Sequence, residues 1–193
     1  TRQAKIEAAP AKALPATDSY KPNQIANALH PKVQYLKVVK IEEEACNAKR
    51  YYLAPNEEKG TKALAWFSAG QYLSITLKIG NMTLTRPYSL ASSPRESLEG
   101  IYMLTIQKVE GGLASQFIHD NWQVGTEVTA SEPLGNFTYE PLRDATTVVA
   151  VVGGSSITPF RALAMAIADG DEDCDLTILY GSRTLEDTIF QKD

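Results

Sequence analysis

The pattern of apolar residues in this chain of 193 residues changes close to Pro141. Before that point, short β-like runs are separated by turn residues, as in antiparallel sheets. After it, residues 147–152 (TVVAVV) form a continuous apolar run that ends at the pair Gly153-Gly154. A run of this kind is typical of a parallel strand that is buried on both faces. The sequence therefore predicts two units of different fold class.

The first unit is rich in β-branched and aromatic residues. The expected strands are residues 33–41, 50–53, 71–79, 82–90, 102–109 and 126–130. The pair Gly80-Asn81 suits the turn of a hairpin between two of them. One helix is expected over Leu113–Trp122, directly after the pair Gly111-Gly112. Several short strands with turn signals and one helix indicate a small antiparallel barrel or sandwich.

The second unit alternates strands with helical segments. After the strand at residues 147–152 we expect a helix over Pro159–Ala168, a buried strand over Asp175–Tyr180 and a helix over Leu185–Lys192. This is one βαβ unit and a further helix, the opening of a parallel sheet. About 50 residues follow Pro141, and two parallel strands do not complete such a sheet. We therefore expect either a fragment or a sheet that another polypeptide completes.

The expected domain boundaries follow from these patterns. Residues 1–30 are rich in Ala, Pro and Lys and are predicted to be a flexible arm or linker, with a short helix at Asn23–Leu29. Residues 31–142 form the barrel unit, and residues 143–193 form the incomplete parallel-sheet unit.

Composition excludes several classes of protein. Two cysteines, Cys46 and Cys174, do not make a disulfide scaffold. Together with two histidines they are too few for an iron–sulfur cluster or a typical Cys/His zinc site, so we predict no metal, and a one-electron metal centre must lie elsewhere. The net charge of −4 argues against a nucleic-acid partner. The longest apolar run is too short to span a bilayer, and the start lacks a secretory signal pattern, which predicts a cytoplasmic location.

Residues 86–89 (RPYS) end an expected strand and combine three chemistries. Arg86 can bind a phosphate bidentately. Tyr88 lies two positions further on the same face and can pack along an aromatic ring. The Ser89 hydroxyl can hydrogen-bond a heteroatom of that ring. These residues suit a ligand with a phosphate and an aromatic group, although the string alone also fits a polar strand end.

Two glycine-rich turns stand before expected helices. Residues 111–115 (GGLAS) follow a strand, and free N–H groups at a helix N-terminus bind anions. Residues 153–159 (GGSSITP) lie between a buried strand and a helix, where open α/β sheets bind nucleotides. Each turn alone is also compatible with an ordinary connection.

The order and context of these motifs, with residues 133–137 (PLGNF) and 179–184 (LYGSRT), resemble the ferredoxin–NADP reductase superfamily. Within it, the chain looks most like bacterial reductase components that pass electrons to ferredoxins or oxygenases. The resemblance covers roughly residues 32–193. It implies a Greek-key FAD-binding barrel followed by an NAD(P)-binding domain.

The resemblance also implies roles for individual residues. Arg86 would bind the FAD pyrophosphate, Tyr88 would pack on the flavin beside Pro87, and Ser89 would lie near N5, the hydride-accepting atom. The pyrophosphate loop comprises Gly111, Gly112, Leu113, Ala114 and Ser115. The nicotinamide nucleotide would lie near Gly154, Ser155 and Thr158.

The donor and acceptor follow from the same resemblance. NAD(P)H would reduce FAD, and single electrons would pass to a ferredoxin, an iron–sulfur protein or domain, or an oxygenase. Ser182 and Arg183 would lie near the adenosine ribose, and Arg183 beside a 2′-phosphate would favour NADPH. The third glycine of the family's nucleotide motif is Ser156 here, and the family's later strands are absent. An alternative is a FAD-binding electron-transfer or regulatory subunit that does not oxidise NAD(P)H; a barrel for an unrelated ligand is a third.

Overall fold

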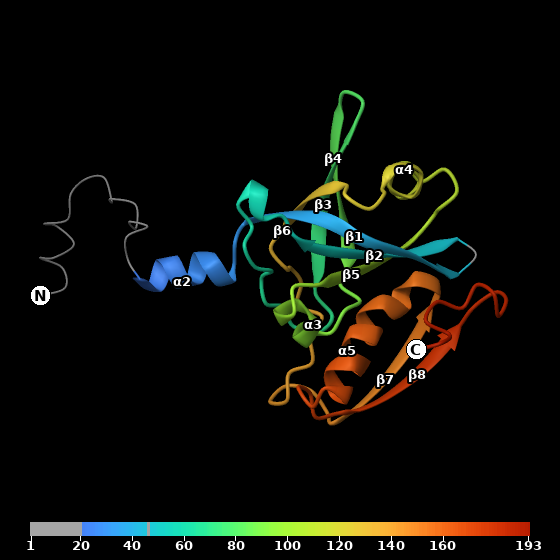
Figure 1. Ribbon diagram of the computed structural model, residues 1–193. Helices are drawn as coiled ribbons and strands as arrows, with labels where there is room; N and C mark the ends of the chain where they lie inside the picture. Colours follow the sequence, from blue (N-terminus) through green and yellow to red (C-terminus); the bar gives the residue numbers. More distant parts are fainter. Residues whose placement is uncertain (1–20, 46) are drawn as a thin grey trace, which may run out of the picture.

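The computed structural model describes residues 21–45 and 47–193. Its first unit is a six-stranded antiparallel sheet in the order β4-β3-β6-β1-β2-β5. The strands are β1 (Val33–Ala45), β2 (Ala48–Pro55), β3 (Tyr72–Ile79), β4 (Met82–Ser89), β5 (Tyr102–Gln107) and β6 (Glu127–Ser131). The sheet curls into a barrel, and β6 lies between two hairpins (Figure 1). The predicted antiparallel barrel is confirmed.

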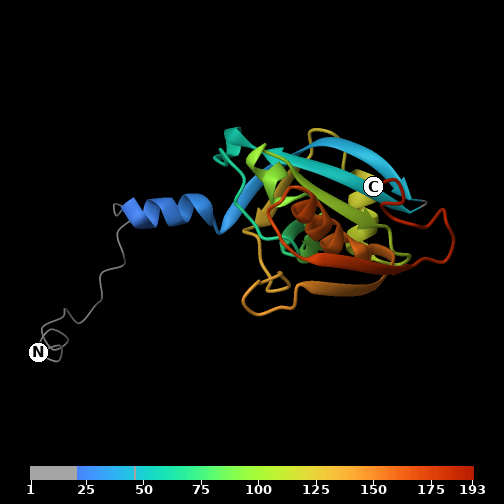
Figure 2. The same cartoon turned by 90° about the horizontal axis from the view of Figure 1, so that it is seen from below.

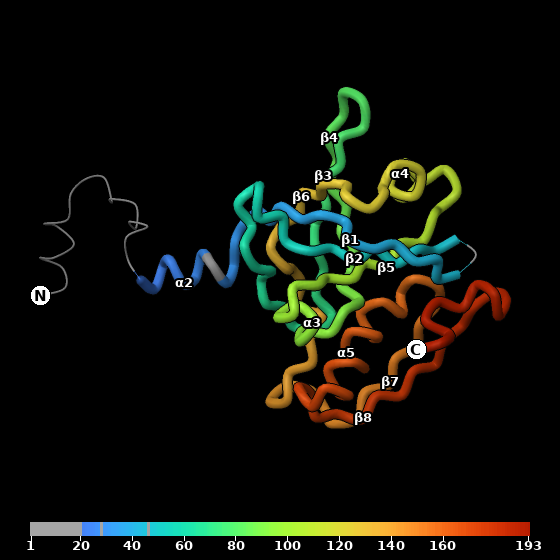
Figure 3. Tube along the Cα trace, viewed as in Figure 1, coloured from blue at the N-terminus to red at the C-terminus, as the bar shows by residue number. Residues whose placement is uncertain are grey.

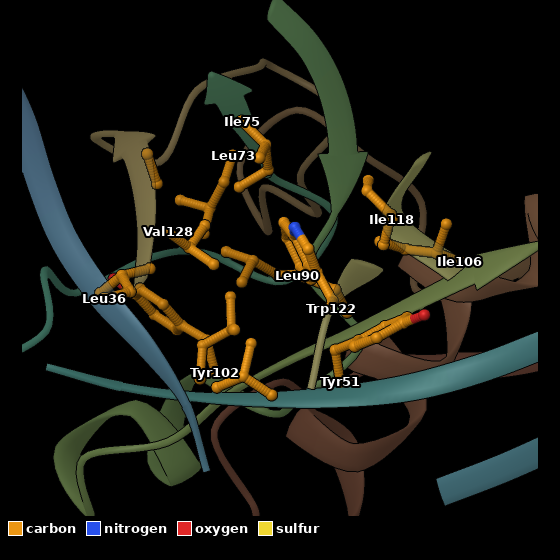
Figure 4. Close-up of a cluster of buried hydrophobic side chains, with 14 of the residues drawn as sticks. Leu36, Tyr51, Leu73, Ile75, Leu90, Tyr102, Ile106, Ile118, Trp122 and Val128 are labelled. Carbon is orange, nitrogen blue, oxygen red and sulfur yellow. The ribbon is translucent and has the colours of Figure 1, made fainter. Parts of the chain in front are cut away.

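Alternation of side chains along the strands builds the barrel core. Leu36 and Val38 of β1 and Leu73 and Ile75 of β3 are buried at every second position. They meet Tyr102, Leu104 and Ile106 of β5 in one apolar cluster, which Figure 4 shows in close-up. Burial of this apolar surface is the main force that fixes the strand register.

The barrel has a seam between β4 and β5. These two strands stand at opposite ends of the sheet order, so each keeps one unpaired edge. They are linked by an isolated bridge between Leu90 and Leu104, and the Ala91 N–H donates to the Met103 carbonyl at 2.8 Å. Beyond this bridge no ladder joins the described residues of the two strands, and the seam stays open there.

Two α-helices accompany the barrel strands where the sequence predicts one. Helix α4 (Leu113–Asn121) is the expected one and buries Ile118 against the core. Helix α3 (Pro94–Leu98) was not predicted. The Ser93 side chain caps its N-terminus and Glu96 bonds back to the Ser93 N–H. The residues 93–96 (SPRE) carry the capping-box pattern, which was the available signal. A 3₁₀ turn, η1 (Glu57–Lys59), follows β2.

The second unit is the predicted βαβ unit. Strands β7 (Thr147–Gly153) and β8 (Asp175–Gly181) pair in parallel in a separate two-stranded sheet. The connection comprises a 3₁₀ turn, η2 (Gly154–Ile157), and helix α5 (Thr158–Ala168). Ala162, Leu163 and Ala166 are buried on α5.

The expectation that both strands are buried on both faces is wrong. Val149 and Val151 of β7 are 61% and 79% exposed, and Leu179 of β8 is 57% exposed. Ala150 and Val152, which point to the other face, are buried. The described residues cover only one face of this sheet, although its apolar run is typical of a strand that is buried on both faces.

The predicted helix over Leu185–Lys192 is also wrong. The segment forms turns, and Phe190 takes a left-handed backbone conformation with φ 61°. The Ile189 N–H donates to the Tyr180 hydroxyl and the Phe190 N–H donates to Glu44. These N–H groups bond to side chains of other elements, which replaces the intrahelical carbonyl partners.

Side-chain contacts hold the two units together; the βαβ unit lies below the barrel in Figure 1 and in front of it in Figure 2, which is seen from below. Arg161 of α5 donates to the Ala91 carbonyl of the barrel at 2.6 Å and pairs with Asp193. Asp193 also pairs with Arg50 of β2, and Arg95 of α3 pairs with Asp171. This packing places the turn after β7 beside the barrel seam.

The N-terminal helix is confirmed as α2 (Lys21–Leu29), which projects away from the barrel (Figure 3). The predicted arm at residues 1–20 lies outside the described residues. No helix in the described part of the chain is long and apolar enough to cross a membrane.

Candidate functional site

A cavity of about 500 Å³ opens at the barrel seam and reaches the βαβ unit. It gathers most of the predicted site residues from four separate segments. The lining residues are Arg86, Pro87, Tyr88, Ser89, Thr105, Ile106, Gln107, Val109, Gly112, Leu113, Ala114, Ser115, Ser155 and Thr158. The geometry therefore joins three motifs that are up to about 70 residues apart in the sequence.

Arg86 offers an exposed cation at the mouth of this cavity. Its Nη1 donates to the neighbouring Thr85 carbonyl at 2.8 Å, and no carboxylate pairs with it among the described residues. Nearly all of its guanidinium donors are free for a ligand. An unpaired Arg beside a helix N-terminus suits a phosphate or pyrophosphate group.

Tyr88 and Ser89 stand further along the same wall. Tyr88 is half-buried and packs against the barrel core, and burial raises the pKa of its phenol. The ring is therefore neutral over the physiological range and presents an apolar face. Ser89 is half-buried and pairs through its backbone with Tyr72 of β3. Pro87 sets the backbone between Arg86 and Tyr88 on a strand edge that needs no donor.

The loop before α4 leaves no room for a side chain at Gly112. A Cβ there would lie 2.9 Å from Ser115 Oγ and 3.0 Å from the Val109 carbonyl. Ser115 Oγ accepts the Val109 N–H and donates to the Gly112 carbonyl, so it holds the loop closed. The resemblance gives Ser115 a direct contact with pyrophosphate; in this structure its hydroxyl is already engaged within the loop.

The first turn of α4 faces the cavity without a side-chain cap. Leu113, Ala114 and Ser115 supply the N–H groups of that turn. Such groups, with the positive end of the helix dipole, attract anions. The loop, the helix N-terminus and Arg86 together suit a pyrophosphate group.

His119 holds helix α4 against strand β5. Its Nε2 donates to the Ile106 carbonyl of β5 at 2.7 Å, which ties α4 to the strand that lines the cavity. Its ring meets Tyr51 edge-on, with 6.1 Å between ring centroids. Burial lowers the pKa of His119 below 6.5. The histidine is therefore neutral at pH 7 and acts as a structural donor.

This shift predicts a pH-dependent stability. The unfolded chain takes up a proton on His119 near pH 6.5, whereas the folded chain resists protonation. We expect the contribution of His119 to the free energy of unfolding to be complete above that pH and to be lost as the pH falls below it. Denaturant unfolding between pH 7.5 and 5.5 would measure the loss. The variant His119→Gln keeps a donor without titrating, and equal pH slopes in both proteins would contradict the prediction.

Three of the four remaining predicted residues line a neighbouring cavity of about 800 Å³. Gly154, Ser182 and Arg183 contribute to it, and it shares Gln107 and Val109 with the first cavity. The Tyr180 hydroxyl donates to the Gly154 carbonyl at 3.1 Å, and Thr158 Oγ1 donates to the Ser155 carbonyl at 2.8 Å. These bonds fix the turn between β7 and α5. Gly111 lines neither cavity.

Strand β5 supplies cavity residues that sequence reasoning missed. Thr105 and Gln107 line the site, but no motif marks them. Their signal was the alternation of β5, where polar residues at two alternate positions interrupt an apolar strand.

The family model of the "Oxidoreductase FAD-binding domain" matches residues 35–139, more than half of the chain. The chain belongs to this FAD-binding family. Its relatives are ferredoxin reductase-type flavoproteins. The cavity fits the cofactor, because the glycine cradle, the uncapped helix and Arg86 suit the pyrophosphate and Tyr88 offers a ring face to the flavin.

Known relatives resemble the chain over most of its length. It is 29% identical to the glycine betaine monooxygenase reductase subunit of Chromohalobacter salexigens over 67% of this chain and 34% of that protein. It is 33% identical to ferredoxin–NADP reductase B of Sorangium cellulosum, over 65% of this chain and 50% of that protein. The chain thus spans a third to a half of the length of these relatives.

Solved structures share the fold. The FAD/NAD-binding domain of nitric oxide dioxygenase from Vibrio cholerae gives a TM-score of 0.72 at 23% identity, covering 82% of this chain and 66% of that chain. Phthalate dioxygenase reductase gives a TM-score of 0.70 at 25% identity, covering 82% of this chain and 46% of that chain. The barrel followed by a parallel-sheet unit is therefore the fold of this family, as the motifs predicted.

Proposed function

We propose that this chain forms the FAD-binding unit and the start of the NAD(P)H-binding unit of a reductase. The reductase passes electrons from NAD(P)H through FAD to a ferredoxin, an iron–sulfur protein or an oxygenase. Bound FAD supplies the chemistry, because it takes up a hydride and gives out single electrons. The protein binds and orients the two nucleotides.

One observation carries this proposal. Ser155 and Thr158 of the βαβ unit line the same cavity as Arg86, Tyr88 and Ser89 of the barrel. A donor nucleotide held at the turn after β7 would therefore meet a ring held by the barrel. Ser89 stays our candidate for the residue nearest the reacting atom of the flavin. Thr158, at the start of α5, is the candidate neighbour of the nicotinamide.

The neighbouring cavity suits the rest of the donor. Ser182 and Arg183 are exposed at its wall, directly after the end of β8. Arg183 forms no ion pair with any described residue, so its guanidinium is available for a 2′-phosphate. This supports NADPH over NADH as the donor.

The acceptor and the location belong to the same proposal. Relatives named as oxygenase reductases and as a ferredoxin–NADP reductase support an iron–sulfur protein or an oxygenase as the partner. Cys174 forms no disulfide with any described residue, which is typical of reducing compartments and supports a cytoplasmic location.

Absorption spectroscopy tests the proposal. The purified chain is incubated with FAD, desalted and scanned, and then receives NADPH or NADH without oxygen. We expect a retained flavin spectrum that bleaches, faster with NADPH. Retained flavin that neither nucleotide bleaches would favour the alternative, a FAD-binding subunit that does not oxidise NAD(P)H. No retained flavin would contradict the proposal.

A further inference from the structure

Two buried hydroxyl groups lack a hydrogen-bond partner among the described residues, Tyr51 Oη and Thr105 Oγ1. Such groups are uncommon in folded proteins, because an unpaired buried hydroxyl has lost its bonds to water. Their positions differ. Tyr51 lies in the barrel core beside Trp122 (Figure 4), whereas Thr105 lines the cavity at the seam.

Strand β5 explains why Thr105 is turned toward the cavity. Tyr102, Leu104 and Ile106 fill the barrel core. Thr105 lies between them in the sequence and therefore projects from the opposite side of the strand. It is only 6% exposed, so water hardly reaches it.

The other buried or engaged polar groups of the cavity already have partners. Thr158 donates to the Ser155 carbonyl, and Ser115 donates to the Gly112 carbonyl. Gln107 Nε2 donates to Asn47 Oδ1 at 3.1 Å. Thr105 is the one buried hydroxyl of this wall that is left without a partner.

We propose that Thr105 hydrogen-bonds a polar atom on the edge of the bound flavin ring and thereby sets both the affinity and the reduction potential of the cofactor. This inference rests on the proposed function. The flavin is the occupant to which we commit, since Thr105 belongs to the barrel and lines the same cavity as Tyr88 and Ser89. Carbonyl and ring nitrogen atoms at that edge match a hydroxyl, which can donate or accept. Hydrogen bonds to the ring tune its electronics.

The test compares two variants that each remove an unpaired buried hydroxyl, Thr105→Val and Tyr51→Phe. Both should leave the apoprotein as stable as the parent or raise its Tm, because no bond is lost. Only Thr105→Val should weaken FAD binding, by about five- to tenfold. It should also lower the midpoint potential and shift the visible flavin bands. Thr105→Ser should restore all three properties.

Each other outcome overturns the inference. Equal FAD affinity and equal flavin bands in Thr105→Val and the parent would show that the hydroxyl has no role toward the ring. If that variant kept both but raised the KM for NADPH, the partner would be the donor nucleotide. Equal loss in Thr105→Ser and Thr105→Val would assign the effect to packing. Should Thr105→Val not fold, Thr105→Ala is judged by the same criteria. A parent chain that retains no FAD overturns the proposed function as well, which separates the two failures.

Discussion

Replacing Arg86 by alanine is expected to weaken FAD binding about 100-fold. Arg86 is exposed at the cavity and donates to one neighbouring carbonyl, so its charge is unpaired among the described residues. Charge-assisted hydrogen bonds contribute roughly 1.5–3 kcal/mol each, which corresponds to about 10- to 150-fold in affinity. Titration of the apoprotein with FAD, followed by flavin fluorescence, measures the dissociation constant.

Two further variants sharpen the Arg86 experiment. Arg86→Lys keeps the charge but loses the planar fork, so we expect an intermediate loss of about tenfold. Arg143→Ala removes an exposed arginine that pairs with the neighbouring Asp144 and lies outside the cavity, and it should leave FAD affinity unchanged. Arg86→Ala binding within threefold of the parent would contradict a pyrophosphate contact at this residue.

Replacing Gly70 by alanine is expected to destabilise the chain by about 3 kcal/mol, combining left-handed strain with overpacking. Gly70 has φ +100°, and a Cβ there would lie 1.8 Å from the Phe137 carbonyl oxygen. The contact is with backbone, so rotation of a side chain cannot relieve it. Phe137 in turn packs edge-on against Phe160 of α5, with 5.3 Å between ring centroids. The change should therefore displace the segment that connects the barrel to the βαβ unit.

Gly60 provides the matched control for Gly70. Its φ is +94°, but nothing lies within 4 Å of a Cβ at that position. Gly60→Ala should lower the free energy of unfolding by about 1 kcal/mol, from backbone strain alone. Urea unfolding of both variants isolates the steric contribution at Gly70. Equal losses in the two variants would show that the segment at Phe137 moves aside without cost.

The barrel was predictable because its information is local. Alternating apolar residues and turn signals such as Gly80-Asn81 specify strands and hairpins without reference to distant segments. The motif residues were predictable for a related reason, since Arg86, Gly112 and Ser155 stand at strand ends and helix starts. Their convergence on one cavity depends on how the two units pack, which the sequence does not state directly.

The remaining differences arise where tertiary contacts outweigh local preference. Residues 185–192 have a helical pattern, but Tyr180 and Glu44 take up backbone N–H groups that a helix needs. The apolar run of β7 is typical of a strand that is buried on both faces. Val151 is nevertheless 79% exposed, because the described residues cover only the opposite face of its sheet. Alternation along β5 marks Thr105 as a residue that faces away from the barrel core, but its lack of a hydrogen-bond partner among the described residues becomes visible only in the structure.

The open seam gives the cofactor a structural role beyond chemistry. Leu90, directly after β4, forms one isolated bridge with Leu104 of β5, and the cavity is lined by residues of both strands. A ligand that contacts both strands would link them at this seam, as a hydrogen-bond ladder links neighbouring strands in a closed barrel. Because FAD binds the folded chain, the folded state gains stability by mass action as the FAD concentration rises. The concentration of available flavin then affects which fraction of the chain is folded, as well as which fraction carries the cofactor.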